Sequence, residues 1–268
     1  MLPDIQNGIS SLNQKLDWVG VEGIQLPFKV RMKEGKIQDT IAIIDAYVSL
    51  NKDKVGINMS RIPIILHEKL KKNELDSFYL EEILHALKEK LNSEEALVRI
   101  SFNYFVPKKS PISNNIGYYF APSSFIGRIQ NNNFIIHYLE TNIQYTSLCE
   151  CSKAISDNGA HNQRSVANII VEYKNNVEKI NEIVWIEELI EYVEKCCSCP
   201  IYPILKRVDE KYITEQAYNN PKFVETVARE ITTLLKKDNR VISYKIKVTH
   251  HESIHQHDAV AIVKENWI

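Results

Sequence analysis

The spacing of apolar positions predicts that strands and helices alternate along this chain. β-Branched and aromatic runs between 23 and 50 predict two strands that turn at 33–36. Apolar residues alternate with polar ones over 98–104, as expected for a half-buried strand. A further strand pair is expected between 117 and 145, whereas residues 1–20 are expected to be irregular.

Apolar residues three and four positions apart predict amphipathic helices between these strands. In the first half, one helix is expected at about 63–72, and a longer one begins at a cap provided by Asp76 or Ser77. In the second half, a helix is expected at about 184–194. Another is expected to begin at the cap and first-turn proline of 220–221.

The second half of the chain repeats the order of the first. Strands are predicted there at 133–148, 165–173, 242–248 and 257–264. Each half therefore has the order strand, strand, helix, helix, strand, strand.

A weak echo between the halves indicates a duplication. Gly-Ile-Asn-Met-Ser-Arg at 56–61 resembles Gly-Ala-His-Asn-Gln-Arg at 159–164, and each string follows a Ser-Leu pair and precedes a Glu-Glu pair. The sequence therefore predicts an α+β protein of two ββααββ units. We expect a first unit at 1–130, including an N-terminal lead-in, and a second at 131–268.

Composition and charge exclude several classes of protein. The 268 residues are 44% hydrophobic and 25% charged, which is ordinary for a globular protein, and the net charge of −1 gives no basic field for nucleic acid. No run approaches the ~18 apolar residues of a membrane span. No apolar signal core follows Met1, so we expect a cytoplasmic protein. The five cysteines are therefore expected to be thiols.

Candidate chemistry is concentrated in one polar segment between two predicted strands. Cys149 and Cys151 precede His161 by about a dozen residues, and Arg164 follows it. Thiolate and imidazole suit borderline-soft metals such as zinc, although a Cys-x-Cys pair is also found as a buried or redox-active pair. The thiols at 196–199 lie at a predicted helix end, where packing is favoured over a second zinc site.

Several strings closely resemble the prokaryotic GTP cyclohydrolase family of type IB. The strings span almost the whole chain in the family's order: 4–7, 56–61, 149–153, 159–165, 205–218 and 252–257. Gly-Ala-His-Asn-Gln-Arg-Ser at 159–165 is the most specific of them. The resemblance implies a tandem tunnelling fold (T-fold) with antiparallel sheets and helices on one face. It also implies a homotetramer with active sites at subunit interfaces.

The activity implied by the resemblance is a cyclic-amidine hydrolysis. GTP would be converted to 7,8-dihydroneopterin triphosphate and formate, the entry to folate biosynthesis. Each active site would hold one divalent metal, namely zinc, manganese or iron. The resemblance implies four catalytic residues, Cys149, Cys151, His161 and Glu215. It also implies a metal-ligand set of Cys149, His161, His255 and His257. Which of His255 and His257 binds the metal is open.

Guanine and triphosphate recognition would come from one acid and several cations. Guanine presents N1–H and a 2-amino group as adjacent donors, which one carboxylate accepts together, and Glu215 resembles the family's purine anchor. Composition alone favours Glu215 as a solvated acid ahead of a helix, and surface cations are usually solvated. The candidate triphosphate ligands are Lys153, Arg164, Lys206, Arg207 and, from across an interface, Arg61.

The sequence departs from the family pattern at two positions. Glu150 stands between the thiols where relatives commonly have proline, and Pro200 follows Cys199 where some relatives carry a glutamate. Three alternative functions stay open. They are an iron-dependent cyclohydrolase that releases the 2′,3′-cyclic phosphate, a non-catalytic purine- or metal-binding module, and a thiol-redox protein. The last is disfavoured because no Cys-x-x-Cys accompanies a βαβ pattern.

Overall fold

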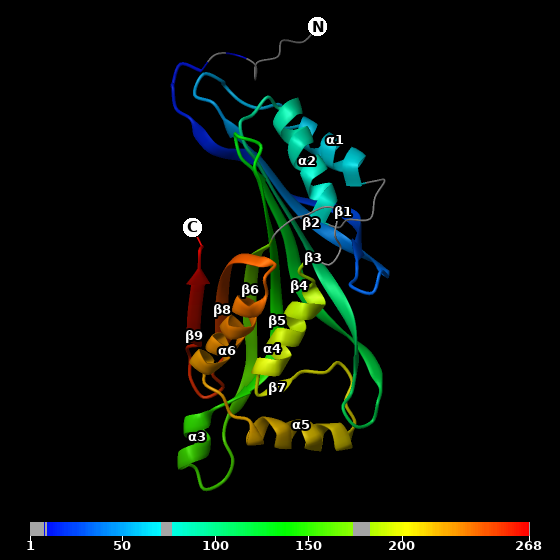
Figure 1. Cartoon of the computed structure of the whole chain (residues 1–268), viewed down its shortest axis with the longest axis vertical. Helices are drawn as coiled ribbons and strands as arrows, with labels where there is room; N and C mark the ends of the chain where they lie inside the picture. Colours follow the sequence, from blue (N-terminus) through cyan, green and yellow to red (C-terminus); the bar gives the residue numbers. More distant parts are fainter. Residues whose placement is uncertain (1–7, 9, 71–76, 174–182, 268) are drawn as a thin grey trace. The chain divides into compact units, whose positions relative to one another are not determined.

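The computed structural model describes residues 8, 10–70, 77–173 and 183–267. Its elements form an α+β fold that divides into two compact units (Figure 1). The first unit contains the described residues up to Asn103 together with 124–138. The second contains 104–123, 139–173 and 183–267. Strands β3, β4 and β5 each contribute residues to both units.

The elements of the first unit are two long strands, two helices and parts of the three shared strands. They are β1 (Leu16–Arg31), β2 (Ile37–Leu50), α1 (Arg61–Leu70), α2 (Ser77–Lys90), β3 (Ala96–Lys109), β4 (Ile116–Ile129) and β5 (Ile135–Leu148). β1 pairs antiparallel with β2, and β2 pairs antiparallel with β3. The predicted turn at 33–36 closes the β1–β2 hairpin, where the Met32 N–H donates to the Lys36 carbonyl at 2.8 Å.

One face of the first unit's strands is covered by helix α2. Residues 42, 44, 46 and 48 of β2 are buried, whereas Ile41 and Ile43 on the opposite face are exposed. The contact with α2 is close at Gly127 of β4, where an added Cβ would lie 2.6 Å from a methyl carbon of Leu80. Leu80 and Leu84 are buried, as the apolar spacing of this helix predicts.

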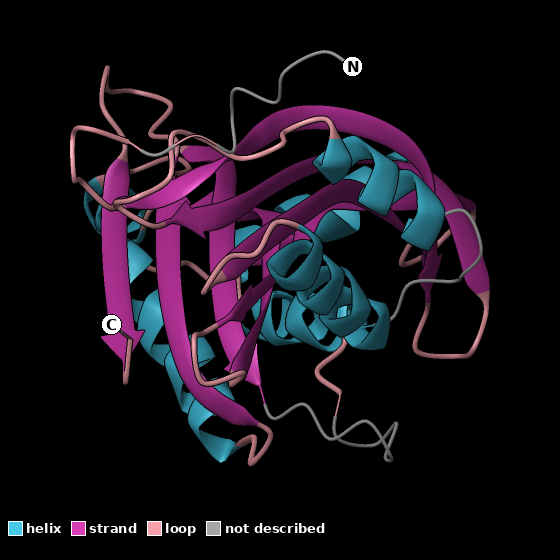
Figure 2. Ribbon diagram, turned by 90° about the horizontal axis from the view of Figure 1, so that it is seen from above, coloured by secondary structure: helices cyan, strands magenta, loops and turns pink. Residues whose placement is uncertain are grey.

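The remaining helices and strands belong to the second unit. They are α3 (Glu150–Ile155), β6 (Asn162–Tyr173), α4 (Ile186–Cys196), β7 (Cys199–Pro200), α5 (Arg207–Asn219), α6 (Val224–Lys237), β8 (Val241–His250) and β9 (Ala259–Glu265). β6 pairs antiparallel with β8, and β8 with β9. α4 and α6 contact each other, and α6 packs on β8, where Tyr244, Ile246 and Val248 are buried. In each unit taken by itself, the helices lie alongside the strands that they cover (Figure 2).

Among the described residues, the strands pair in the order β1-β2-β3-β4-β5-β6-β8-β9, with β7 beside β5. The second strand predicted between 23 and 50, the strand at 98–104 and the strand pair between 117 and 145 are confirmed as β2, β3, β4 and β5. None of the described helices combines the length and apolar character that a membrane crossing requires. The predicted division of the chain into two consecutive units at 1–130 and 131–268 stays a prediction.

Three sequence predictions are wrong, and two helices were missed. β1 begins at Leu16 and not at residue 23, because Gly23, with φ of 74°, lies at an irregularity inside the strand and not at its start. Asn220 ends α5 instead of starting α6, which begins at Val224. His257 lies in a turn ahead of β9 and not on a strand. α3 and α5 were not predicted. Asp76 lies outside the described residues.

The two echoing strings fold differently. Residues 56–60 form the turn that leads into α1, and Arg61 is the first residue of that helix. Residues 162–164 belong to strand β6. The echo therefore does not mark structurally equivalent positions.

Candidate active site

Cys149 and His161 lie next to each other in the second unit. The backbone N–H of Cys149 donates to the carbonyl of His161 at 3.1 Å. Cys149 caps α3, and its Sγ accepts the backbone N–H of Ser152 at 3.3 Å. The Ser152 hydroxyl accepts the backbone N–H of His161, also at 3.3 Å. The short helix α3 thus holds the thiol and the imidazole residue together.

A buried chain of polar side chains orients the His161 ring. His161 Nδ1 lies 2.9 Å from Gln163 Oε1, and Gln163 Nε2 donates to Ser147 Oγ at 2.9 Å. Ser147 Oγ in turn lies 2.7 Å from Ser165 Oγ. Because an amide oxygen can only accept, the Nδ1 contact places the proton on Nδ1 and leaves the Nε2 lone pair available. A metal-binding histidine is commonly held in this way.

The turn between β8 and β9 brings a carboxylate to the same ring. Glu252 Oε2 lies 3.7 Å from His161 Nδ1, and both side chains are largely buried. The His251 N–H donates to the Arg164 carbonyl at 3.2 Å, which fixes the start of this turn. His255 and His257 occupy the same turn, are exposed, and stack with ring centroids 4.9 Å apart.

Helix α5 carries the predicted purine anchor and contacts α3. Lys153 of α3 donates to the Tyr218 carbonyl, and its Nζ lies 4.3 Å from the centre of the Tyr218 ring. Glu215 is exposed on α5, with Lys211 one turn earlier at 3.8 Å. This ion pair is weak because both side chains are solvated. The Glu215 carboxylate is therefore accessible to a ligand.

The predicted triphosphate cations lie on several elements. Arg164 is exposed on β6, on the strand face opposite to Gln163 and Ser165. Lys206 and Arg207 are exposed at the start of α5. Arg61 belongs to the first unit, where its guanidinium donates to the Lys90 carbonyl at 2.9 Å. Cys151 is exposed on α3.

The remaining thiols are buried. Burial raises the pKa of Cys196 and of Cys199 to about 11, and it also raises the pKa of Cys197. Cys199 packs against Leu148 and Ala217, and its Sγ contacts Gln216 Oε1 at 3.5 Å. Neutral, buried thiols of this kind are neither nucleophiles nor ready metal ligands, which agrees with the predicted packing role.

Across the residues that the structure describes, no group of three or more His, Cys, Asp or Glu side chains is placed to hold a metal ion. Cys149 and His161 lie together, His255 and His257 form a second pair, and Glu215 stands apart on α5. Sequence reasoning missed Gln163 and Glu252, which contact the His161 ring. The alternation of 161, 163 and 165, which continues into strand β6, is the signal that could have found Gln163.

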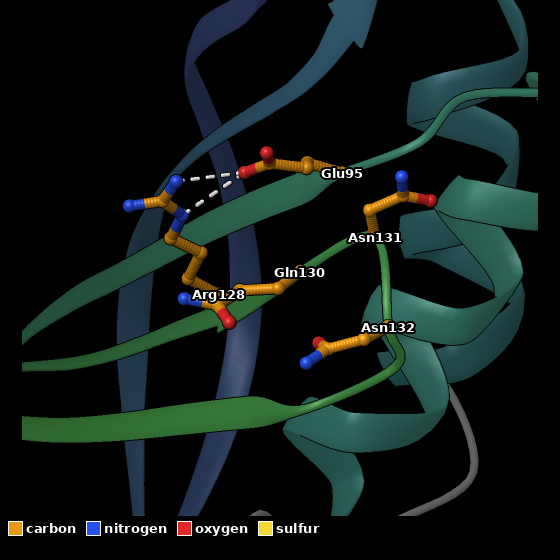
Figure 3. A pocket seen from close by; sticks show the side chains of 5 residues that line it. All are labelled: Glu95, Arg128, Gln130, Asn131 and Asn132. Carbon is orange, nitrogen blue, oxygen red and sulfur yellow. Dashed lines mark hydrogen bonds and ion pairs between the residues drawn. The ribbon is translucent and has the colours of Figure 1, made fainter.

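A separate polar pocket lies in the first unit (Figure 3), with a volume of about 440 Å³. The guanidinium of Arg128 lines it, but this group is bound by Glu95 Oε2 at 2.8 and 3.2 Å. The pocket's other lining residues are the side chains of Gln130, Asn131 and Asn132. Because Glu95 neutralises the cation, this pocket lacks the net positive charge that a triphosphate requires. None of the predicted site residues lines it.

Comparison with known proteins decides the family. Residues 2–261 match the family described as type I GTP cyclohydrolase FolE2. The chain belongs to this family. Relatives named GTP cyclohydrolase FolE2 occur in Methylobacillus flagellatus, with 38% identity over 99% of this chain and 96% of the relative, and in Dictyoglomus thermophilum, with 40% identity over 99% and 98%. The predicted family resemblance is confirmed.

Solved structures with a similar fold include urate oxidases. The uricase of Arthrobacter globiformis matches with a TM-score of 0.58 over 92% of both chains, at 6% identity. The urate oxidase of Bacillus sp. TB-90 matches with a TM-score of 0.57 over 93% of this chain and 99% of that one, at 10% identity. Identities this low concern the fold alone. They support the tunnelling type of fold that the sequence predicted for this FolE2 family member.

Proposed function

We propose that this protein converts GTP to 7,8-dihydroneopterin triphosphate and formate, the first step of folate biosynthesis. The match to the FolE2 family over nearly the whole chain supports the substrate. The single observation that carries the chemistry is the Cys149–His161 pair, in which the hydrogen bond to Gln163 leaves His161 Nε2 free to bind an electrophile. The type IB assignment within the family is part of this proposal.

Cys149 and His161 would supply two of the ligands that one divalent metal requires. Cys149 supplies a soft sulfur, and His161 supplies an imidazole whose proton is held on the far nitrogen. His255 or His257, in the turn that also presents Glu252 to His161, is the proposed third ligand. When bound, such a metal lowers the pKa of a bound water towards ~7 and so supplies hydroxide at neutral pH.

The chain's own groups would then bind and orient GTP. Water must add at C8 of the guanine imidazole before the ring N–C bonds break and C8 leaves as formate. The accessible Glu215 carboxylate accepts the guanine N1–H and 2-amino donors together, which fixes the base in one orientation. Lys153, Arg164, Lys206 and Arg207 are the proposed triphosphate cations, and Cys151 is the proposed second thiol of the site.

We further propose a homotetramer with interfacial active sites. This assembly would explain why Arg164 is exposed on the face of β6 opposite to Gln163, and it would let Arg61 act in a neighbouring subunit's site. A tandem ββααββ architecture is part of the same proposal. It is supported by the order β5, β6, α4, α6, β8, β9 if α3, β7 and α5 are insertions. The cytoplasm stays the predicted compartment.

The test is GTP turnover by chelator-treated protein that is reconstituted separately with Zn(II), Mn(II) and Fe(II). Formate release and pterin fluorescence after oxidation are measured together. Activity with one ion is expected and would identify the metal. Absence of formate with every ion, from protein that is folded, would overturn the proposal in favour of a non-catalytic binding module. Phosphate analysis of the product separates the open triphosphate from the 2′,3′-cyclic phosphate.

A further inference from the structure

Helix α5 makes few apolar contacts with the rest of the second unit. Of its residues only Asp209, in the first turn, and Ala217, near the end, are buried. The rest of the helix, including Lys211 and Glu215, is largely exposed. Burial of apolar surface therefore contributes little at the N-terminal end, and the position of the helix there depends on polar contacts.

Asp209 joins the start of α5 to the turn between β3 and β4. Its Oδ1 accepts the backbone N–H groups of Ile112 at 2.9 Å and Ser113 at 2.8 Å. Its Oδ2 accepts the Ser113 hydroxyl and the backbone N–H of Lys206, the latter at 2.8 Å. Burial alone would raise the pKa of Asp209, but these hydrogen bonds outweigh it and hold the pKa well below its usual value. The carboxylate is thus charged and fully satisfied.

The segment before α5 touches the same hairpin independently. Gly117 of β4 lies so close to Pro203 that an added Cβ would approach its Cγ to 2.7 Å. The ammonium group of Lys108 on β3 lies 4.5 Å from the centre of the Tyr202 ring. The β3–β4 hairpin therefore contacts residues 202–209 at several points, and it lies beside one end of α5 (Figure 1).

The opposite end of α5 meets the Cys149 segment. Ala217 packs against Leu148, the residue before Cys149. Lys153 of α3 contacts both the carbonyl and the ring of Tyr218. Asn220, which ends the helix, donates to the Cys197 carbonyl at 2.9 Å. α5 is a straight connection between the hairpin and the segment that holds Cys149.

We propose that Asp209 is a positioning residue that fixes α5 between the β3–β4 hairpin and α3, and thereby sets where Glu215 stands relative to Cys149 and His161. This inference rests on the proposed function, because Glu215 is there the purine anchor. Asp209 itself touches no substrate. Its loss should weaken GTP binding through Glu215 and leave the metal ligands in place, because Cys149 and His161 are held by α3 and β6.

The experiment compares Asp209→Asn with Ser113→Ala and with Asp238→Asn. Ser113→Ala removes only the hydroxyl donor and is the milder change. Asp238→Asn is the matched control, because Asp238 is also a buried carboxylate bound by several donors, but it ends α6 and contacts Arg240 and Tyr192. For each protein, KM and kcat for GTP, affinity for the activating metal alone, and amide hydrogen exchange are measured.

We expect Asp209→Asn to raise KM for GTP about tenfold, with kcat changed less than threefold and metal affinity unchanged. Exchange should accelerate in 110–115 and in α5. Ser113→Ala should raise KM by a smaller factor, and Asp238→Asn should leave KM near the wild-type value. A merely structural role predicts instead that both aspartate variants lower stability without a selective rise in KM.

Two outcomes separate this inference from the proposed function. If the wild type releases formate and Asp209→Asn keeps its KM, the positioning role is wrong and the proposed function stands. If the wild type releases no formate, the proposed function is wrong. Calorimetric binding of GTP to metal-loaded wild type and Asp209→Asn then tests the positioning role, and equal affinities overturn it.

Discussion

The backbone hydrogen bond from Cys149 to His161, 3.1 Å long, places a thiol and an imidazole side by side although about a dozen residues separate them in the chain. The intervening residues form helix α3 and the turn at Gly159, whose φ of 79° is readily adopted by glycine. The position of each residue thus depends on the backbone of the other. A change at Cys149 can be designed to alter the sulfur without altering this backbone arrangement.

Cys149→Ser should abolish turnover and metal binding together while α3 remains folded. The serine hydroxyl can still accept the Ser152 N–H as a helix cap, but it replaces a soft thiolate by a weakly binding oxygen. We expect metal affinity to fall by more than about 100-fold, because loss of a direct ligand should exceed the effect of losing an outer hydrogen-bond partner. Metal titration checks this, with circular dichroism as the test of folding.

Ser156→Ala is the matched control for that change. Ser156 ends α3, and its hydroxyl contacts only the Asn158 carbonyl among the partners described for it, at 3.2 Å. This variant should bind metal like the wild type. If Cys149→Ser also binds metal normally, Cys149 is not a ligand and the proposed site must be redrawn.

Gln163→Leu should lower metal affinity by roughly 10- to 100-fold through His161. The leucine removes the acceptor on Nδ1, so the ring can rotate or place its proton on Nε2, the nitrogen that must bind the metal. Gln163→Glu should restore most of the affinity, because a carboxylate still accepts from Nδ1. Metal titration without GTP provides the measurement. If both variants bind the metal as tightly as the wild type does, Gln163 has no positioning role.

Glu215→Gln should raise KM for GTP and weaken discrimination against inosine triphosphate, which lacks the 2-amino group. The amide keeps one acceptor and loses the charge, so a rise in KM of about 10- to 100-fold is expected. Metal affinity should not change. Glu210→Gln, another exposed acid on α5, is the control and should leave KM unaltered. Loss of metal from Glu215→Gln would show that Glu215 is not the purine anchor.

Much of the fold follows from apolar spacing. The strand at 98–104 and helix α2 were predicted because burial on one face imposes a period of two or of about 3.6 residues on the sequence. Helix α5 escaped prediction because its attachment is polar. Asp209 and the residues around Ala217 hold it, so no apolar stripe of helical period is required. Its boundary with α6 was misplaced for a related reason, since Asn220 binds carbonyl groups of 197 and 198 and does not cap α6.

Some residues of the candidate site could also be predicted from the sequence, and others could not. Cys149 and His161 could be predicted because unusual residue types occur close together in sequence. Glu252 could not, because its approach to His161 depends on the pairing of β6 with β8, which places residue 165 opposite residue 250. Residues far apart in the chain become neighbours only through such strand registers. The exposed positions of Arg164 and Arg61 are likewise set by the fold and not by local sequence.

The stability of the second unit should fall as the pH drops from about 6.5 towards 4, because of His250. Burial lowers the pKa of His250 to about 4, and His251 acts in the same direction, whereas Glu225 opposes the shift. The neutral ring lies 2.9 Å from the Tyr145 hydroxyl, which can donate to His250 Nε2. In the unfolded chain the imidazole takes up its proton near pH 6.5, so acid favours unfolding.

Protonation of His250 should lower the free energy of unfolding by about 2 kcal/mol between pH 7 and pH 5. His250→Gln should lack it, because the amide oxygen still accepts from Tyr145 but does not titrate. Urea unfolding of wild type and variant at pH 7, 6 and 5 measures the difference. The variant is expected to be less stable at pH 7 through imperfect packing, and the gap should narrow by about 2 kcal/mol at pH 5. A gap that stays constant over this range would mean that His250 is protonated as readily in the folded protein as in the unfolded chain.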